Sequence, residues 1–285
     1  MHAIASSGAA TAPAAQTAAA APPRAALRDL AAGALRIVTP PLLGLVLFVL
    51  AWHGVASWIP ALPGPAATWH AAVPLFADPF YRNGPNDQGI GWNVLASLAR
   101  VGAGFGLAAL IGIPAGFLLG RFAFLNAMAA PIISLLRPVS PLAWLPIGLL
   151  LFKAANPAAI WAIFICSIWP MLINTAFGVA GVRKDWLNVA RTLEVSPLRK
   201  AFLVILPAAA PTIITGMRIS MDIAWLVIVA AEMLIGGNGI GYFLWNEWNN
   251  LSLANVLFAV LMIGVVGMAL DLMFAALQKK VTYAE

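Results

Sequence analysis

Residues 101–119 read VGAGFGLAALIGIPAGFLL and contain no charged residue. A second stretch, residues 154–182, reads AANPAAIWAIFICSIWPMLINTAFGVAGV and is also free of charge. Each is long enough to cross the hydrocarbon core of a bilayer, which takes about 20 mainly apolar residues. The alternative is that they are buried helices of a large soluble protein, but such a protein needs a water-facing polar face on many of its helices. Neither stretch has one, so both predict membrane-spanning helices.

The whole chain has the composition of a membrane protein. Of its 285 residues, 62% are hydrophobic and 9% are charged, whereas about 25% are charged in an ordinary soluble domain. Proline and glycine interrupt several apolar segments, which a helix bundle tolerates because neighbouring helices satisfy the freed backbone groups. We therefore predict an all-α membrane protein with about six transmembrane helices. The six segments are 37–59, 94–120, 126–152, 157–182, 211–235 and 251–277.

The basic residues between these segments predict the orientation. Arg82 and Lys153 fall on one side of the predicted spans. The opposite side carries many more, namely Arg24, Arg28, Arg36, Arg121, Arg183, Lys184, Arg191, Arg199, Lys200, Lys279 and Lys280. Because cytoplasmic loops carry the excess of Lys and Arg, both termini are predicted to lie in the cytoplasm. The net charge of +6 then needs no nucleic acid partner to explain it.

The two ends of the predicted membrane domain have different compositions. Residues 1–35 are rich in Ala and Pro, which predicts a disordered cytoplasmic head. Residues 36–285 form the transmembrane domain, with an outer loop at about 60–92 and a cytoplasmic loop at 183–207. The three histidines and the single cysteine, Cys166, come with no cluster of ligating residues, so no metal site is predicted.

The cytoplasmic loop 183–207 has the pattern of a helical hairpin. Asp185 can cap a short helix, and Ser196 followed by Pro197 starts a second one. One face of the first helix is apolar, with Trp186, Ala190 and Leu193 at helical spacing and Val189 beside them. The residues around this face are basic, namely Arg191, Arg199 and Lys200. Such a hairpin suits a groove on a soluble partner or the headgroups of the inner leaflet. The residues alone leave both open.

The same loop resembles the "EAA" loop of ABC importer permeases. The family pattern is Glu-Ala-Ala, a Gly four residues later, and then Ile-x-Leu-Pro. Residues 188–194 read NVARTLE, so Asn188, Val189 and Glu194 replace the Glu, the first Ala and the Gly. A turn at Glu194 therefore cannot rely on the access of glycine to positive φ. Matches at other positions, and further motifs such as GMRI at 216–219 and GIG at 239–241, extend the resemblance over about 92–283.

This resemblance implies a type I ABC importer permease fold in the bacterial inner membrane. It implies a second permease copy in a homodimer, two cytoplasmic ATP-binding subunits and an external solute-binding protein. The sequence has no G-x-x-x-x-G-K-[ST] phosphate loop, so ATP and Mg are expected on the partner subunits, with no cofactor and no enzyme activity in this chain. The expected ATPase-coupling residues are Trp186, Asn188, Val189, Ala190, Arg191, Leu193, Glu194, Arg199, Lys200, Leu206 and Pro207.

Within the family, the chain is similar to the nitrate-type permeases. The motifs that carry this similarity are DPFYRNGPNDQGIGW at 78–92 and RPVSPLAWLP at 137–146. The resemblance implies transport of nitrate, with nitrite or cyanate as further candidates. Bicarbonate, a sulfonate or taurine is the alternative cargo, and a self-contained secondary transporter is the alternative class.

Charged residues inside the spans supply candidates for an anion passage. An Arg facing lipid costs at least about 2.5–3.5 kcal/mol, so Arg137 should point into the bundle or a wet cavity. The candidate passage is Arg137 with Ser140, Asn174 and Thr175 as hydrogen-bond donors. In the alternative interpretation Arg137 donates to carbonyls that Pro138 and Pro141 leave free. Three further assignments concern other spans: Arg218 and Asp222 neutralise each other at i, i+4, and Glu232 and Asp271 are buried hydrogen-bonding groups.

Overall fold

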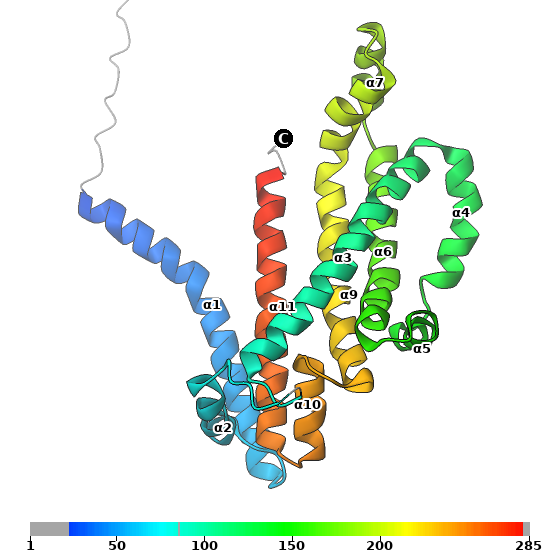
Figure 1. The fold of residues 1–285 in the computed structure, drawn as a ribbon. Coiled ribbons are helices and arrows are strands. Elements are labelled where there is room, and N and C mark those ends of the chain that lie inside the picture. Colours follow the sequence, from blue (N-terminus) through cyan, green and yellow to red (C-terminus); the bar gives the residue numbers. More distant parts are fainter. Residues whose placement is uncertain (1–22, 85, 282–285) are drawn as a thin grey trace, which may run out of the picture. The chain divides into compact units, whose positions relative to one another are not determined.

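The protein is helical throughout the part of the chain that the structure describes. The structure is a computed structural model and describes residues 23–84 and 86–281 (Figure 1). Its elements are α1 (Pro23–Trp58), α2 (Pro65–Ala77), α3 (Ile90–Arg121), α4 (Ala123–Leu136), α5 (Pro141–Phe152), α6 (Ala155–Ala180), α7 (Lys184–Thr192), α8 (Pro197–Lys200), the π-helix η1 (Ala201–Ile205), α9 (Leu206–Ile235), α10 (Ile240–Asn249) and α11 (Leu253–Val281). The β-structure of the described residues is a single isolated bridge between Arg82 and Gln88. The predicted all-α class is confirmed.

The first of two compact units, Met1–Ile59, contains α1. Most of the predicted disordered head, residues 1–22, lies outside the described residues, but residues 23–35 are helical and differ from that prediction. Pro23 suits the first turn of a helix, and the following Ala and Leu residues are strong helix formers. Beyond residue 39 the apolar side chains of α1 are exposed, among them Leu43 at 62% and Leu47 at 64%. Such a helix needs lipid or another chain around it.

The second unit, Pro60–Glu285, contains all other elements. In Figure 1, α7 lies at the end of this unit toward which α3 and α11 run, and α2 and α10 lie at the opposite end. We call the first of these the basic end. Its basic residues are Arg121 on α3, the cluster around α7 and α8, and Lys279 and Lys280 on α11.

Most of the predicted outer loop is ordered at the end opposite to the basic end. Pro65 opens α2 at its first turn, and α2 packs on α11 with the Phe76 and Phe258 rings edge to face at 5.3 Å. A tight turn follows, in which the Arg82 guanidinium lies 3.9 Å from the Trp92 ring centroid. Burial, together with a hydrogen bond to Asp87, raises the pKa of Tyr81 in this turn.

Five helices of the described chain are long and apolar enough to cross a membrane. A sixth crossing results if α4 and α5 count as one span, but these two helices meet at an angle of 98°. The third predicted span, 126–152, is therefore not one straight helix but a pair of helices with a sharp bend between them. The cause lies in Pro138 and Pro141, since proline removes a backbone donor and disfavours helical geometry in the residue before it. Ser140 accordingly leaves the helical region, with ψ at 136°.

Small residues bring α3 and α6 into close contact. Gly104, Gly112, Gly116 and Gly120 recur at multiples of four on the face of α3 that meets α6. A Cβ atom on Gly116 would stand 2.5 Å from the Leu172 carbonyl oxygen, so only glycine permits this approach. Small residues spaced in this way are typical of helix contacts inside membranes.

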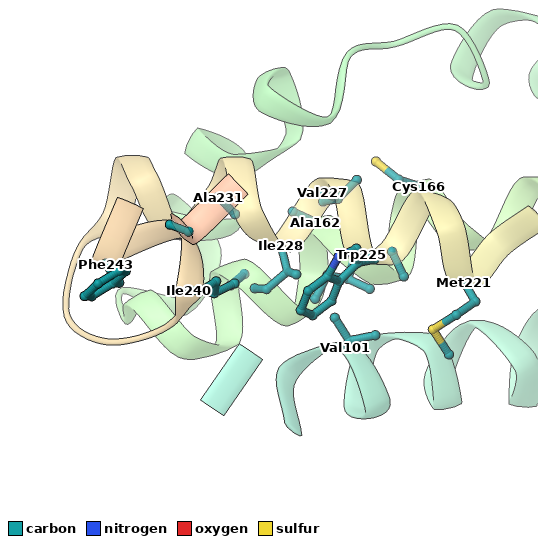
Figure 2. Packing of buried hydrophobic residues seen from close by; sticks show 14 of the residues in the cluster. Val101, Ala162, Cys166, Met221, Trp225, Val227, Ile228, Ala231, Ile240 and Phe243 are labelled. Carbon is teal, nitrogen blue, oxygen red and sulfur yellow. The ribbon is translucent and has the colours of Figure 1, made fainter. Parts of the chain in front are cut away.

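The core lies where α3, α6, α9 and α10 meet, with α11 alongside (Figure 2). Ile163, Ile228 and Ile240 are fully buried there, and Val101 is almost so. The side of α9 that carries Trp225 faces α11, because its indole Nε1 donates to the Ile263 carbonyl at 3.0 Å. This packing fixes α9 as the central helix of the unit.

Candidate functional site

A buried polar network joins α3, α6 and α9 near the end opposite to the basic end. The guanidinium of Arg100 donates from NH1 to Glu232 Oε1 at 2.6 Å and from Nε to Asn156 Oδ1 at 2.7 Å. It also donates to the backbone carbonyl of Asn238 at 2.8 Å and to the side-chain oxygen of the same residue. The Glu232 side chain is fully buried, and that of Arg100 is 10% exposed. The expectation that Glu232 is a buried hydrogen-bonding group is confirmed.

The network continues into the loop between α9 and α10. Ser97 Oγ donates to the Glu232 carboxylate at 2.8 Å and accepts from the Ile240 amide at 2.9 Å. The Gly239 amide donates to Asn93 Oδ1 at 2.8 Å. Gly239 has φ at +123°, and a Cβ atom there would stand 2.2 Å from the Glu232 carboxyl carbon. The loop is thus tied to α3 by backbone donors that only glycine places correctly at this position.

The loop between α6 and α9 forms a hairpin at the basic end, as predicted. Its first helix, α7, begins two residues earlier than expected, so Asp185 lies inside the first turn and Arg183 occupies the cap position. It ends in a Schellman motif, with the Val195 amide donating to Ala190 O and the Glu194 amide to Arg191 O, both at 3.0 Å. Glu194 has φ at +53°, so a glutamate adopts the left-handed conformation at the position where the resembled loop has glycine.

The apolar face of α7 is divided between two environments. Trp186, Val189 and Leu193 are 47%, 58% and 70% exposed, whereas Ala190 is buried. Ala190 therefore does not belong to the exposed apolar face, in contrast to the prediction, because α7 packs against η1 on that side. We call Trp186, Val189 and Leu193 the α7 knob. The polar and basic residues of the predicted set, Asn188, Arg191 and Arg199, are exposed around it.

The second arm of the hairpin does not end before the next span. It runs through α8 and the π-helix η1 into α9, giving one apolar helical segment from Pro197 to Ile235. A π-helical turn shifts the backbone hydrogen bonds and accommodates Pro207, which has no amide proton and whose ring would clash with a carbonyl four residues earlier. Leu206 packs on the cluster that includes Val179. The loop is therefore continuous with a membrane span.

Arg137 lies at the break between α4 and α5, not in the middle of a span as the sequence suggested. It lines a cavity of about 220 Å³ together with Asn174, Trp169 and residues of α9 such as Ile219. Among the described residues no hydrogen bond or ion pair engages its guanidinium. The interpretation in which Arg137 satisfies freed carbonyls therefore finds no such contact in the described chain.

The structure brings Asn174 to Arg137 but not the other two predicted residues. The Asn174 side-chain amide donates to Pro170 O at 2.8 Å, which leaves its carbonyl oxygen for another donor. Ser140 occupies the N-cap position of α5 without a side-chain cap hydrogen bond, and Thr175 is fully buried against α3, where a Cβ on Gly116 would meet it at 2.8 Å. Neither Ser140 nor Thr175 lines the cavity.

The predicted i, i+4 ion pair between Arg218 and Asp222 is wrong. Arg218 instead forms a bidentate ion pair with Asp271 of α11: its Nε donates to Oδ1 at 2.5 Å and its NH2 donates to Oδ2 at 2.8 Å. The contact across two helices offers the planar fork geometry that Arg and carboxylate prefer. Asp271 is hydrogen-bonded as expected, but its side chain is 34% exposed and not buried. Asp222 is exposed on α9.

Five or six apolar spans, together with a helical hairpin that runs directly into one of them, define a multi-pass membrane protein. Comparison with known proteins supports this class. Residues 109–283 match the family described as binding-protein-dependent transport system inner membrane component. The nitrate import permease protein NrtB of Synechocystis sp. is 41% identical over 249 residues, which cover 87% of this chain and 90% of that protein.

Two further relatives bear on the fold and on the cargo. The bicarbonate transport system permease protein CmpB of Synechocystis sp. is 42% identical over 246 residues, covering 85% of this chain and 88% of that protein. Among solved structures, a chain of the MetNI methionine ABC transporter in an inward-facing conformation superposes with a TM-score of 0.61. It shares 15% identity and covers 68% of this chain and 96% of its own length, so it bears on the fold alone.

The chain belongs to the family of inner-membrane components of binding-protein-dependent ABC transport systems. It has the type I ABC permease fold and is a multi-pass protein of the inner membrane. Its relatives include nitrate and bicarbonate permeases at nearly equal identity.

Proposed function

We propose that this chain is the translocation subunit of an ATP-driven importer for a small oxyanion, with nitrate as the cargo. The observation that carries the proposal is the similarity, over most of the chain, to nitrate and bicarbonate permeases alike. Nitrate and bicarbonate are both planar, singly charged ions with three oxygens around a central atom. The shared chemistry defines the cargo class, and the motifs at 78–92 and 137–146 favour nitrate within it.

The cavity beside Arg137 is the candidate passage for this ion. A guanidinium without a carboxylate partner offers positive charge and a planar set of donors, which match a planar oxyanion. Asn174, which lines the same cavity, adds a polar group. The break between α4 and α5 places this charge at an interrupted span, where transporters commonly hold their substrates.

The α7 knob is the candidate contact with a cytoplasmic ATP-binding subunit. Three exposed apolar side chains on one helix face, surrounded by basic residues, suit a hydrophobic groove on a soluble partner. In this proposal ATP and Mg are bound by two such partners, a second copy of this chain completes the passage, and a solute-binding protein delivers the anion from outside. This chain itself performs no chemical step.

Reconstitution tests the cargo. The complete transporter, with its ATP-binding and solute-binding proteins, is placed in vesicles and the uptake of nitrate and of bicarbonate is measured with ATP inside or outside. We expect ATP-dependent nitrate accumulation that excess bicarbonate leaves unchanged. Uptake of bicarbonate in place of nitrate would reject nitrate within the class. Uptake of neither, with active ATP hydrolysis, would reject the class itself.

Two charges on the α7 knob test the coupling. The double variant Trp186→Glu, Leu193→Glu places carboxylates on the exposed apolar face and should abolish uptake while membrane insertion stays normal. The matched control, Lys184→Gln with Thr192→Glu, changes the net charge of the same helix by the same amount at exposed positions outside the knob, and should keep most of the uptake. Equal uptake by both double variants would reject the docking role of the knob.

A further inference from the structure

Two adjoining cavities lie at the basic end of the second unit, between the end of α3 and the segment from α8 to the start of α9. The first, of about 530 Å³, is lined by Arg121, Arg191, Lys200 and Glu194 together with apolar residues. The second, of about 390 Å³, has no charged residue in its wall. Phe117, Leu198 and Ala201 line both. The two cavities therefore form one continuous surface with a charged part and an apolar part.

The charged part has an excess of positive charge. Arg121, Arg191 and Lys200 face a single carboxylate, Glu194. Within the described chain none of these four residues takes part in an ion pair. Three cations gathered from α3, α7 and α8 repel one another unless an anion lies between them. The geometry therefore favours an anionic group in the first cavity.

The apolar part continues deeper along the same helix. Leu118 and Ile113 lie three and eight positions before Arg121, which corresponds to about 5–12 Å along the axis of α3. Across the groove, Leu198 and Phe202 are 73% and 64% exposed. Since α3 spans the membrane and Arg121 marks its end, the charged cavity lies at headgroup depth and the groove lies at the depth of the acyl chains.

We propose that the two cavities together bind one anionic phospholipid. Its phosphate lies among Arg121, Arg191 and Lys200, and one acyl chain lies along the groove beside Leu118 and Phe202. A small soluble anion would use only the charged cavity, whereas a lipid uses both in the order in which a bilayer presents them. Basic pockets between spans are known sites for anionic headgroups.

The occupant would connect the bilayer to the hairpin. Arg191 and Lys200 belong to the loop that carries the α7 knob, and Arg121 belongs to a different span. A phosphate held by all three fixes α7 and α8 relative to α3. The lipid thus becomes part of the surface that positions the knob.

Lipid retention on the whole transporter complex tests the proposal. The complex is equilibrated with phosphatidylglycerol or with phosphatidylcholine, washed, and examined by native mass spectrometry. We expect the wild-type complex to retain phosphatidylglycerol and to release phosphatidylcholine. Arg121→Gln should lower the retention of phosphatidylglycerol about fivefold, the effect of one basic residue at an anionic surface. The control Lys279→Gln removes a charge at the same end but outside both cavities, and should retain the lipid.

Two further measurements distinguish the lipid from other occupants. A phosphatidylglycerol with a photoreactive acyl chain should label the peptides that contain Leu118 and Phe202; labelling spread evenly over the apolar surface would overturn the proposal. Displacement of the lipid by inorganic phosphate at millimolar concentration would show a site for a free anion and would also overturn it. So would retention by the isolated permease but not by the complete complex, because a protein partner would then cover the cavity.

Discussion

Arg100 and Arg137 both fall in apolar segments, yet their surroundings differ in almost every respect. Arg100 is buried, and its donors are taken up by a carboxylate, two side-chain amides and a backbone carbonyl. Arg137 stands beside a cavity at a broken span and has no such partner among the described residues. A fully satisfied buried charge such as Arg100 holds helices together, whereas an exposed charge beside a cavity, such as Arg137, is available to a ligand. The comparison separates a structural arginine from a candidate functional one.

The largest expected effect comes from breaking the Arg100 network. Glu232→Ala leaves a buried guanidinium without its carboxylate, which should lower the free energy of unfolding by about 3–5 kcal/mol. Denaturant unfolding in detergent measures this change. The control Asp185→Ala removes the exposed carboxylate that lies 3.4 Å from Arg183, and should cost less than about 1 kcal/mol. Equal midpoints for both variants would contradict the structural role of the network.

A clash at Gly239 should come next in size. Gly239→Ala brings a methyl group 2.2 Å from the Glu232 carboxyl carbon, which forces the network apart at a cost of about 1–3 kcal/mol beyond backbone strain. Gly237→Ala is the matched control, because Gly237 also has positive φ but nothing lies within 4 Å of its Cβ position. The unfolding free energies of Gly239→Ala and Gly237→Ala differ by the cost of the clash. Equal values would show that Gly239 does not support the network.

Arg137 should respond in uptake and not in stability. Arg137→Gln removes the charge, and we expect nitrate uptake to fall about tenfold while the unfolding free energy changes by less than about 1 kcal/mol, since no partner is lost. Arg137→Lys keeps the charge and should keep substantial uptake. ATP hydrolysis measured alongside locates the defect in the passage. Normal uptake by Arg137→Gln would show that the charge of Arg137 plays no part in transport.

The smallest effect concerns the end of α7. Glu194 adopts positive φ, which costs roughly 1 kcal/mol more for a residue with a Cβ atom than for glycine. Glu194→Gly should therefore raise the unfolding free energy by about 0.5–1 kcal/mol. Glu194→Ala removes the same charge without relieving the backbone and should bring no gain. A gain with alanine would show that the carboxylate, and not the backbone, is the source of the cost.

Composition and local spacing were sufficient to predict the helical class, the spans and the hairpin. Residues near one another in the sequence report on helix periodicity, and 19 uncharged positions in succession at 101–119 leave few alternatives to a membrane span. The break at Pro138 was missed because proline is common inside spans, and the sequence does not show which prolines bend them. The close contacts of Gly116 with α6 were likewise visible only after folding.

Long-range pairing could not be predicted in the same way. Arg218 has an acidic residue four positions away, which favoured Asp222, but the actual partner Asp271 is 53 positions distant. Arg100 and Glu232 are separated by 132 positions, and no local pattern connects them. Which charges meet across helices depends on the rotation of each helix within the bundle, and a single sequence does not record that rotation.

The continuous helical segment Pro197–Ile235 has a mechanical consequence. Its 39 residues correspond to a rod of about 58 Å at 1.5 Å per residue. One end carries the hairpin, and near the other Glu232 is fastened to α3 and α6 through Arg100. If the segment pivots at the Arg100–Glu232 contact, a tilt of about 5° moves its hairpin end by about 5 Å over such a length. A push on the hairpin would tilt the span about this contact, and the stability of the Arg100–Glu232 network would then determine how much of the movement reaches the other side of the bilayer.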